Sequence, residues 1–258
     1  MSHTLDGKSV VITGAGGGIG RATAQLVAAK GASVLCTDVN ADGLKETVRL
    51  IQAESPAVQV VGEALDCTEH GAAVEVITRC ADAWGGDFHA LVNVAGVIMA
   101  KPLMEVELAD LERVFRVNLG GMLVMSQAVA PRLTDGGVIV NVSSSTARSA
   151  SPSLAAYGAS KAANAYLSRA FAAELAERGI RVCGIGPGAV DTAMPRSIMP
   201  PGAEGERLLE AAVAHTQLIK RLAQPEEVAA AICFLLSDDA SYITGSTLWF
   251  DGGASAAH

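Results

Sequence analysis

The chain has 258 residues, of which 50% are apolar, 18% are charged and 27 are glycine, and its formal charge is −8. This composition excludes a largely disordered chain, and an acidic balance without a basic cluster argues against nucleic acid or a membrane surface as a partner. Five scattered cysteines, histidines without ligand spacing, no signal-peptide pattern and no apolar run of membrane-spanning length predict a cytoplasmic protein without a disulfide framework or metal site.

Short runs rich in β-branched residues alternate with longer stretches of helical period. The first run is 9–13, and after a glycine-rich turn a helical stretch follows over 21–30. The other strand candidates, each nearly continuous in apolar residues, are 32–37, 58–64, 88–93, 137–143, 180–185 and 247–250. Strands that are buried on both faces have this pattern. We therefore predict an α/β fold: one domain over 1–258, with a Rossmann-type doubly wound parallel sheet of about seven strands and helices on both faces.

The turn after the first strand carries Gly14, Gly18 and Gly20 in the spacing Thr-Gly-x-x-x-Gly-x-Gly. These glycines let the backbone approach a ligand closely, while the following helix directs its N-terminal amides at a phosphate. The pyrophosphate of a dinucleotide suits such a site. Taken alone, the same pattern also fits a tight strand-to-helix turn without a ligand.

An acid closes the second strand. Asp38 stands eighteen residues after Gly20, where a carboxylate can accept hydrogen bonds from ribose hydroxyls and repel a 2′-phosphate. Neither the residue before Gly18 nor the two residues after Asp38 are cationic, so we predict NAD(H) as the cofactor. The alternative role for this acid is a cap for the next helix, and Asp66 likewise either contacts adenine or caps a helix.

Tyr157 and Lys161 are spaced to lie on one face of a helix. A phenol titrates near ~10 in water, and a neighbouring ammonium favours its anion. This pair therefore predicts a tyrosine that exchanges protons with a substrate, with its pKa lowered by the lysine.

With these motifs the chain resembles the short-chain dehydrogenase/reductase family along essentially its whole length. The segments that carry the resemblance are the glycine turn, 93–96, Asn118, the serines 143–145, Tyr157 with Lys161, 187–188 and 242–253. The resemblance implies four catalytic residues, namely Asn118, Ser144, Tyr157 and Lys161. Ser144 is selected because it stands thirteen residues before Tyr157.

The resemblance also implies their roles. Tyr157 takes the hydroxyl proton as hydride leaves the substrate carbon, and Ser144 holds the same oxygen. Lys161 lowers the pKa of the phenol and binds the nicotinamide ribose, Asn118 kinks its helix and anchors a water, and the segment around Val190 and Thr192 holds the carboxamide. The full set expected to bind NAD is Gly14, Gly18, Ile19, Gly20, Asp38, Asp66, Cys67, Asn93, Ala95, Gly96, Tyr157, Lys161, Pro187, Gly188, Val190 and Thr192.

The segment 194–202 is too rich in proline for regular structure and too apolar for an ordinary solvated loop, so we expect a mobile substrate lid around 190–217. The residues expected to contact substrate are Ser144, Met99, Leu154, Met194, Ile198 and Met199. Their apolar character favours a small secondary alcohol or ketone, such as a cyclic alcohol, dihydrodiol or hydroxysteroid. Arg148 and Arg196 either meet a substrate carboxylate or face solvent.

Two other functions compete with an NAD-dependent alcohol dehydrogenase or ketoreductase. The first is reduction of 3-oxoacyl groups on a carrier protein, against which Asp38 and the acidic charge weigh. The second is a sensor or scaffold that binds NAD without turnover, against which the intact catalytic residues weigh. The segment 242–253 resembles the family's subunit-contact strand, so we also expect a homotetramer by analogy.

Overall fold

The computed structural model describes residues 5–256 and contains one parallel sheet of seven strands in the order β3-β2-β1-β4-β5-β6-β7. The strands are β1 Ser9–Thr13, β2 Ser33–Asp38, β3 Val60–Ala64, β4 Phe88–Asn93, β5 Leu133–Val142, β6 Arg181–Pro187 and β7 Thr247–Phe250. The order reverses between β1 and β4, and in doubly wound sheets the crevice at this point, outside the carboxyl ends of the strands, is where ligands bind. The predicted architecture is confirmed.

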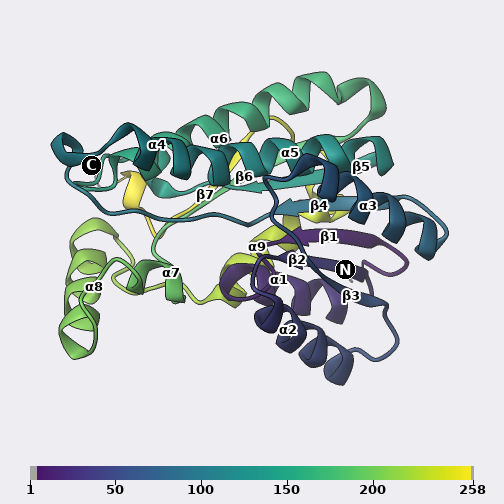
Figure 1. Cartoon of the computed structure of the whole chain (residues 1–258), viewed down its shortest axis with the longest axis horizontal. Coiled ribbons are helices and arrows are strands. Elements are labelled where there is room, and N and C mark those ends of the chain that lie inside the picture. The colour runs from purple at the N-terminus through teal and green to yellow at the C-terminus, as the bar shows by residue number, and fades with distance from the viewer. Residues whose placement is uncertain (1–4, 257–258) are drawn as a thin grey trace.

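Helices cover both faces of the sheet (Figure 1). One layer consists of α1 Gly18–Ala29, α2 Ala41–Glu54 and α9 Pro225–Leu236, and the other of α3 His70–Trp84, α4 Leu108–Phe115, α5 Gly121–Val129 and α6 Ala155–Glu174. Alternate residues of a strand enter opposite cores: Val10 and Ile12 pack with α1 and α9, whereas Val11 packs with α3 and α5. Two covered faces explain why the strands are almost continuously apolar.

The ends of α1, β2, β3 and β6 differ from their predicted bounds by one to three residues, and two other expected elements differ more. Strand β5 begins at Leu133 rather than 137, and its pairing with β4 shifts register between Phe88 and Ala90. Sequence patterns missed this extension because it includes Asp135 and Gly136, which are poor strand formers. The segment 194–202 was expected to be irregular, but it overlaps α7 Ala193–Arg196. Pro195 lies in the first turn of that helix, where the missing N–H removes no helical hydrogen bond.

A second helix, α8 Ala203–Thr216, follows α7, and both lie away from the two layers that sandwich the sheet (Figure 1). Within residues 5–256, no helix has the combined length and apolar character that crossing a membrane requires.

Candidate active site

The glycine turn between β1 and α1 packs directly against the segment that follows β4. Gly14 has φ +67°, and a Cβ built on it would stand 2.8 Å from the Ala95 nitrogen. A Cβ on Gly20 would overlap the Gly14 carbonyl oxygen. The Thr13 hydroxyl accepts hydrogen bonds from the backbone of Val94 and Ala95 at 3.0 and 3.1 Å. Only glycine fits this approach, so the predicted residues of the two strand ends are held side by side.

The start of α1 is arranged for an anionic group. Its N-cap, Gly17, has no side chain to bond the first amides of the helix. A Cβ on Gly18 would lie 3.1 Å from the Cγ2 atom of Thr192, which follows β6. The fold therefore brings Thr192 to the glycine turn, although 174 positions separate it from Gly18 in the chain.

Asp38 ends β2 with both carboxylate oxygens bonded to backbone amides. Its Oδ2 accepts from the nitrogen of Gly16 at 2.9 Å, and its Oδ1 accepts from that of Asn40 at 2.8 Å. The N-cap of α2 is Asn40, whose Oδ1 accepts from Gly43, so capping is not the role of Asp38. Asp66, in contrast, bonds the amide and hydroxyl of Thr68 with Oδ1, which turns the chain ahead of α3.

Tyr157 and Lys161 lie one turn apart on α6, with only 7% and 3% of their surfaces exposed. The Lys161 Nζ lies 5.9 Å from the centre of the tyrosine ring and donates to the Val142 carbonyl at 2.9 Å. The Ser144 hydroxyl, just past the end of β5, accepts from the amide and hydroxyl of Thr146 at 3.2 and 2.9 Å, and it lies close enough to the phenol to lower the pKa of Tyr157. Ser143 donates to the Lys161 carbonyl at 2.8 Å and so ties α6 to the same strand end. The three predicted side chains are thus brought together.

Asn118 lies in a π-helical turn, Arg116–Gly120, that interrupts the path from α4 to α5. Its Oδ1 accepts from the Val97 nitrogen at 2.7 Å, and its Nδ2 donates to the Val97 carbonyl and to the Ser160 hydroxyl at 3.0 and 2.9 Å. A Cβ on Gly96 would lie 3.1 Å from the Asn118 Oδ1 and 3.4 Å from the Lys161 Nζ. Asn118 and Lys161 therefore flank the same glycine.

Burial dominates the electrostatics of the pair. It raises the pKa of Tyr157, opposed by the hydrogen bond with Ser144, and it lowers the pKa of Lys161 to about 8. The expected lowering of the pKa of the phenol is not found, because desolvation of the phenolate is the largest cause and raises this pKa. The two pKa values therefore move apart: the pKa of the phenol rises from its ordinary value, while the pKa of the ammonium falls to about 8.

Several predicted cofactor residues serve the core through their side chains. Asn93 donates to Asn141 at 2.8 Å and to Ser126 at 3.2 Å inside the sheet layer. Cys67 is packed against Gly121, and burial raises the pKa of its thiol to about 11. Their backbones can still meet a ligand. Pro187 is the last residue of β6, and Gly188 and Val190 follow it at the same edge of the sheet as Thr192.

The expected substrate residues lie half-buried on three segments and are Met99, Leu154, Met194, Ile198 and Met199. The backbone amide of Lys101 donates a hydrogen bond of 2.8 Å to the Ser153 carbonyl, which joins the segment that carries Met99 to the segment that carries Leu154. Arg196 is bound to Glu206 at 2.7 Å and to Asp191 at 2.6 Å. It therefore joins α7 to α8 and to the segment after β6, and 36% of its side chain remains exposed to solvent.

A depression of about 310 Å³ opens at the other edge of the sheet, where β1, β4 and β6 begin. Lys8, His89 and Arg181 contribute to its lining, and none of the predicted site residues does. The candidate active site is therefore at the carboxyl edge, where all the contacts described above converge.

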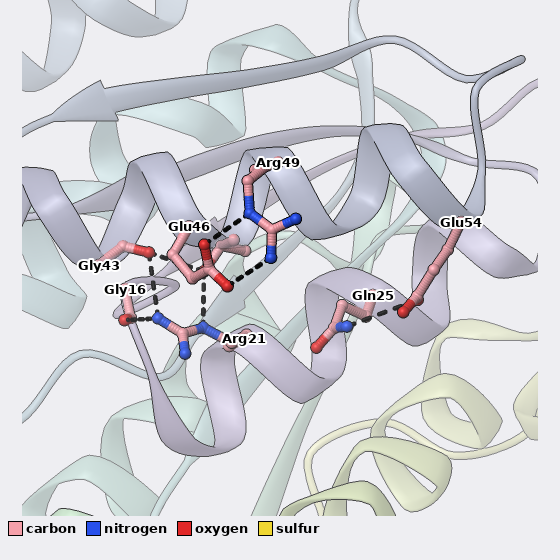
Figure 2. A network of polar contacts seen from close by, with 8 residues as sticks. Gly16, Arg21, Gln25, Gly43, Glu46, Arg49 and Glu54 are labelled. Carbon is pink, nitrogen blue, oxygen red and sulfur yellow. Dashed lines mark hydrogen bonds and ion pairs between the residues drawn. The ribbon is translucent and has the colours of Figure 1, made fainter.

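One residue near the glycine turn was missed by the sequence analysis. Arg21, in the first turns of α1, bonds the carbonyls of Gly16 and Gly43 and the Thr47 hydroxyl (Figure 2). The signal that was overlooked is a cation directly after Gly20, since only the neighbours of Gly18 and Asp38 were searched for positive charge.

Comparison with known proteins agrees with this geometry. A family model described as enoyl-(acyl carrier protein) reductase matches residues 14–255. The chain is 37% identical to a 7α-hydroxysteroid dehydrogenase of Escherichia coli (strain K12), over 96% of this chain and 94% of the relative. It is 36% identical to the 3-oxoacyl-[acyl-carrier-protein] reductase FabG of Thermotoga maritima, over 96% and 98% of the two chains.

Among solved structures, a 7α-hydroxysteroid dehydrogenase complexed with NADH and 7-oxo glycochenodeoxycholic acid superposes with a TM-score of 0.88. The two sequences are 35% identical, and the match covers 98% of this chain and 96% of the other. Sequence match, fold and strand-edge site together establish that the chain belongs to the short-chain dehydrogenase/reductase family.

Proposed function

We propose that the chain is an NAD(H)-dependent oxidoreductase that interconverts a secondary alcohol and a ketone on a small, mostly apolar substrate. The observation that carries the proposal is the buried cluster of Ser144, Tyr157 and Lys161 at the sheet edge where the backbone holds the Asp38 carboxylate. The cluster around Tyr157 is suited to proton transfer, and the Asp38 carboxylate is suited to bind the hydroxyls of a ribose.

The residues present fit NAD. A close-packed glycine turn, helix amides without a side-chain cap and a carboxylate at the end of β2 match a pyrophosphate and an unphosphorylated ribose. Gly18 and Ile19 would hold the pyrophosphate, Asp38 the adenosine ribose, and Lys161 with Thr192 the nicotinamide half. When bound, NAD(H) supplies the hydride acceptor or donor. The NADH complex of the related hydroxysteroid dehydrogenase supports this choice.

The chain's own residues manage the proton. In alcohol oxidation the Tyr157 oxygen accepts the substrate hydroxyl proton, and in ketone reduction it donates that proton to the carbonyl oxygen. Ser144, which lies beside the phenol, orients the same substrate oxygen. Lys161 lies beside the ring, where its ammonium form favours the phenolate, and Asn118 fixes the backbone of Val97.

The pair of Tyr157 and Lys161 predicts the pH dependence. Loss of one proton from the pair gives either neutral lysine with phenol, or ammonium with phenolate, and these two forms carry the same number of protons. The population of the phenolate form therefore follows the first proton loss of the pair, near pH 8, because the pKa of Lys161 is lowered to about 8. A group that must lose a proton to act gains activity as the pH rises.

We expect kcat/KM for alcohol oxidation to rise about tenfold per pH unit below pH 8 and to level off above it. Ketone reduction needs the fully protonated pair, so its kcat/KM is level below pH 8 and falls above it. Initial rates in both directions from pH 6 to 10, with the Kd of NADH measured at each pH as the control, check this. An oxidation rate that ignores pH across this range contradicts the assignment of the proton to the pair.

The substrate class rests on the half-buried apolar residues and on the relatives. Met99, Leu154, Met194 and their neighbours offer an apolar wall, and we propose that α7 and α8 form a lid over it. A steroid-type or cyclic alcohol suits such a wall, and one relative is a hydroxysteroid dehydrogenase. The FabG relative favours 3-oxoacyl carrier reduction as a second candidate. The charge of −8 opposes docking of an acidic carrier.

A panel assay tests the proposal. Cyclic alcohols, hydroxysteroids and the matching ketones, together with a 3-oxoacyl thioester, are incubated with either NAD(H) or NADP(H) while the reduced cofactor is followed by absorbance. We expect turnover of alcohols and ketones with NAD(H). Turnover confined to the thioester with NADPH would support the second candidate, and NADH binding without any turnover would indicate a sensor or scaffold.

A further inference from the structure

The guanidinium of Arg21 ties the glycine turn to the neighbouring helix α2 (Figure 2). Its Nη2 donates to the Gly16 carbonyl at 2.6 Å and to the Gly43 carbonyl at 3.1 Å, and its Nε donates to the Thr47 hydroxyl at 2.9 Å. A planar fork of donors can reach three acceptors at once, whereas an ammonium cannot reach them with the same geometry. Arg21 thus joins three backbone and side-chain groups that belong to two different elements.

Ala15 and Gly16 of the same turn are held by further hydrogen bonds. Thr47, which is fully buried, donates to the Ala15 carbonyl at 2.8 Å, and the Ala15 nitrogen donates to the Thr37 carbonyl at 3.1 Å. The Gly16 nitrogen donates to Asp38, so Gly16 is held on one side by Asp38 and on the other by Arg21. A Cβ on Gly43 would overlap the Gly16 carbonyl oxygen, so the helix backbone lies directly on the turn.

Loss of the Arg21 guanidinium would free the Gly16 carbonyl and so loosen Gly16, whose amide holds the Asp38 carboxylate. This carboxylate is the group assigned to the adenosine ribose. It ends β2, whereas Tyr157 follows β5, and β1 and β4 lie between these two strands in the sheet. We propose that Arg21 is a positioning residue for the adenosine half of the dinucleotide, acting by holding Gly16 and through it the orientation of Asp38. This inference rests on the proposed NAD(H) function.

An interaction that aids binding equally before and during hydride transfer changes Kd and KM but not kcat. For Arg21→Ala we expect the Kd of NADH and the Ki of AMP, which carries only the adenosine half, to rise together by about tenfold. The value of kcat at saturating NADH should stay within about twofold of the parent. Arg21→Lys should recover part of the affinity, since one ammonium can still reach the Gly16 carbonyl.

Two further variants sharpen the test. Thr47→Val removes the hydroxyl that Arg21 binds, so it should weaken AMP in the same direction, and the double variant should lose less than the product of the two single effects. Arg49→Ala is the matched control. This exposed arginine of α2 bonds Glu46 at 2.8 Å through both Nε and Nη2, away from the glycine turn, so its loss should leave AMP binding unchanged (Figure 2).

The outcomes separate the inference from the function on which it rests. If Arg21→Ala binds AMP as tightly as Arg49→Ala does, the positioning role is wrong and the proposed function stands. If Arg21→Ala lowers kcat and the melting temperature while both binding constants stay put, the residue is only a structural brace, and the inference is again wrong. If the unaltered chain binds neither NADH nor AMP, the proposed function and the inference fall together.

Discussion

Replacement of Tyr157 by phenylalanine should lower kcat by about a thousandfold or more in both directions, since a positioned acid or base contributes roughly 10²–10⁴-fold. The variant keeps the ring, which is buried beside Lys161, and loses only the oxygen that exchanges the proton. The Kd of NADH should therefore remain within about twofold of the parent, because cofactor contacts are left in place. Initial rates by absorbance and a fluorescence titration with NADH measure the two quantities.

The same helix offers a control for this experiment. Tyr166 is 63% exposed and stacks with Arg169 on the outer side of α6, so Tyr166→Phe removes a phenol without touching the site. Its rates and melting temperature should match those of the parent. Substantial turnover by Tyr157→Phe, with a folded protein and normal NADH binding, would remove the tyrosine from the proposed mechanism.

The fold was predictable because its physical causes are local to the sequence. Strands covered on both faces must be apolar at nearly every position, and the buried strands β1 and β4 match their predicted bounds. The larger errors concern segments whose residues are not fully buried. The start of β5 includes polar and glycine residues that a sequence pattern assigns to a loop. The first turn of a helix accepts proline, so α7 was hidden inside a proline-rich segment.

The active-site residues were predictable to the extent that spacing determines proximity. Residues four apart on a helix must share a face. A serine just past a strand end can meet such a pair only if the helix packs over that strand, and the hydrogen bond from Ser143 to the Lys161 carbonyl joins the two. The electrostatics were not predictable, because the pKa of Tyr157 depends on how completely the fold buries it. Arg21 was missed for a similar reason: its acceptors come from two elements whose packing only the structure shows.

The second large effect should follow from Asp38→Ala, which removes the carboxylate at the end of β2. Two unit charges about 4 Å apart near a protein surface repel by up to about 4 kcal/mol. Even half of that repulsion, about 2 kcal/mol, weakens the binding of a 2′-phosphorylated cofactor by about thirtyfold. Loss of a charge-assisted hydrogen bond to the ribose costs about 1.5 kcal/mol, or about tenfold, for NAD(H). The ratio of kcat/KM for NADH to that for NADPH should therefore fall by about 300-fold.

The backbone around Asp38 allows this test without collapse of the site. Water can replace the carboxylate at the amides of Gly16 and Asn40, and Arg21 and Thr47 still fasten the turn to α2. Asp42→Ala is the charge-matched control, because Asp42 is exposed in the first turn of α2 and pairs with Lys45 at 2.9 Å. Its cofactor ratio should equal the parent's. If Asp38→Ala also keeps the parental ratio, the carboxylate does not select the cofactor, and some other group must exclude the phosphate.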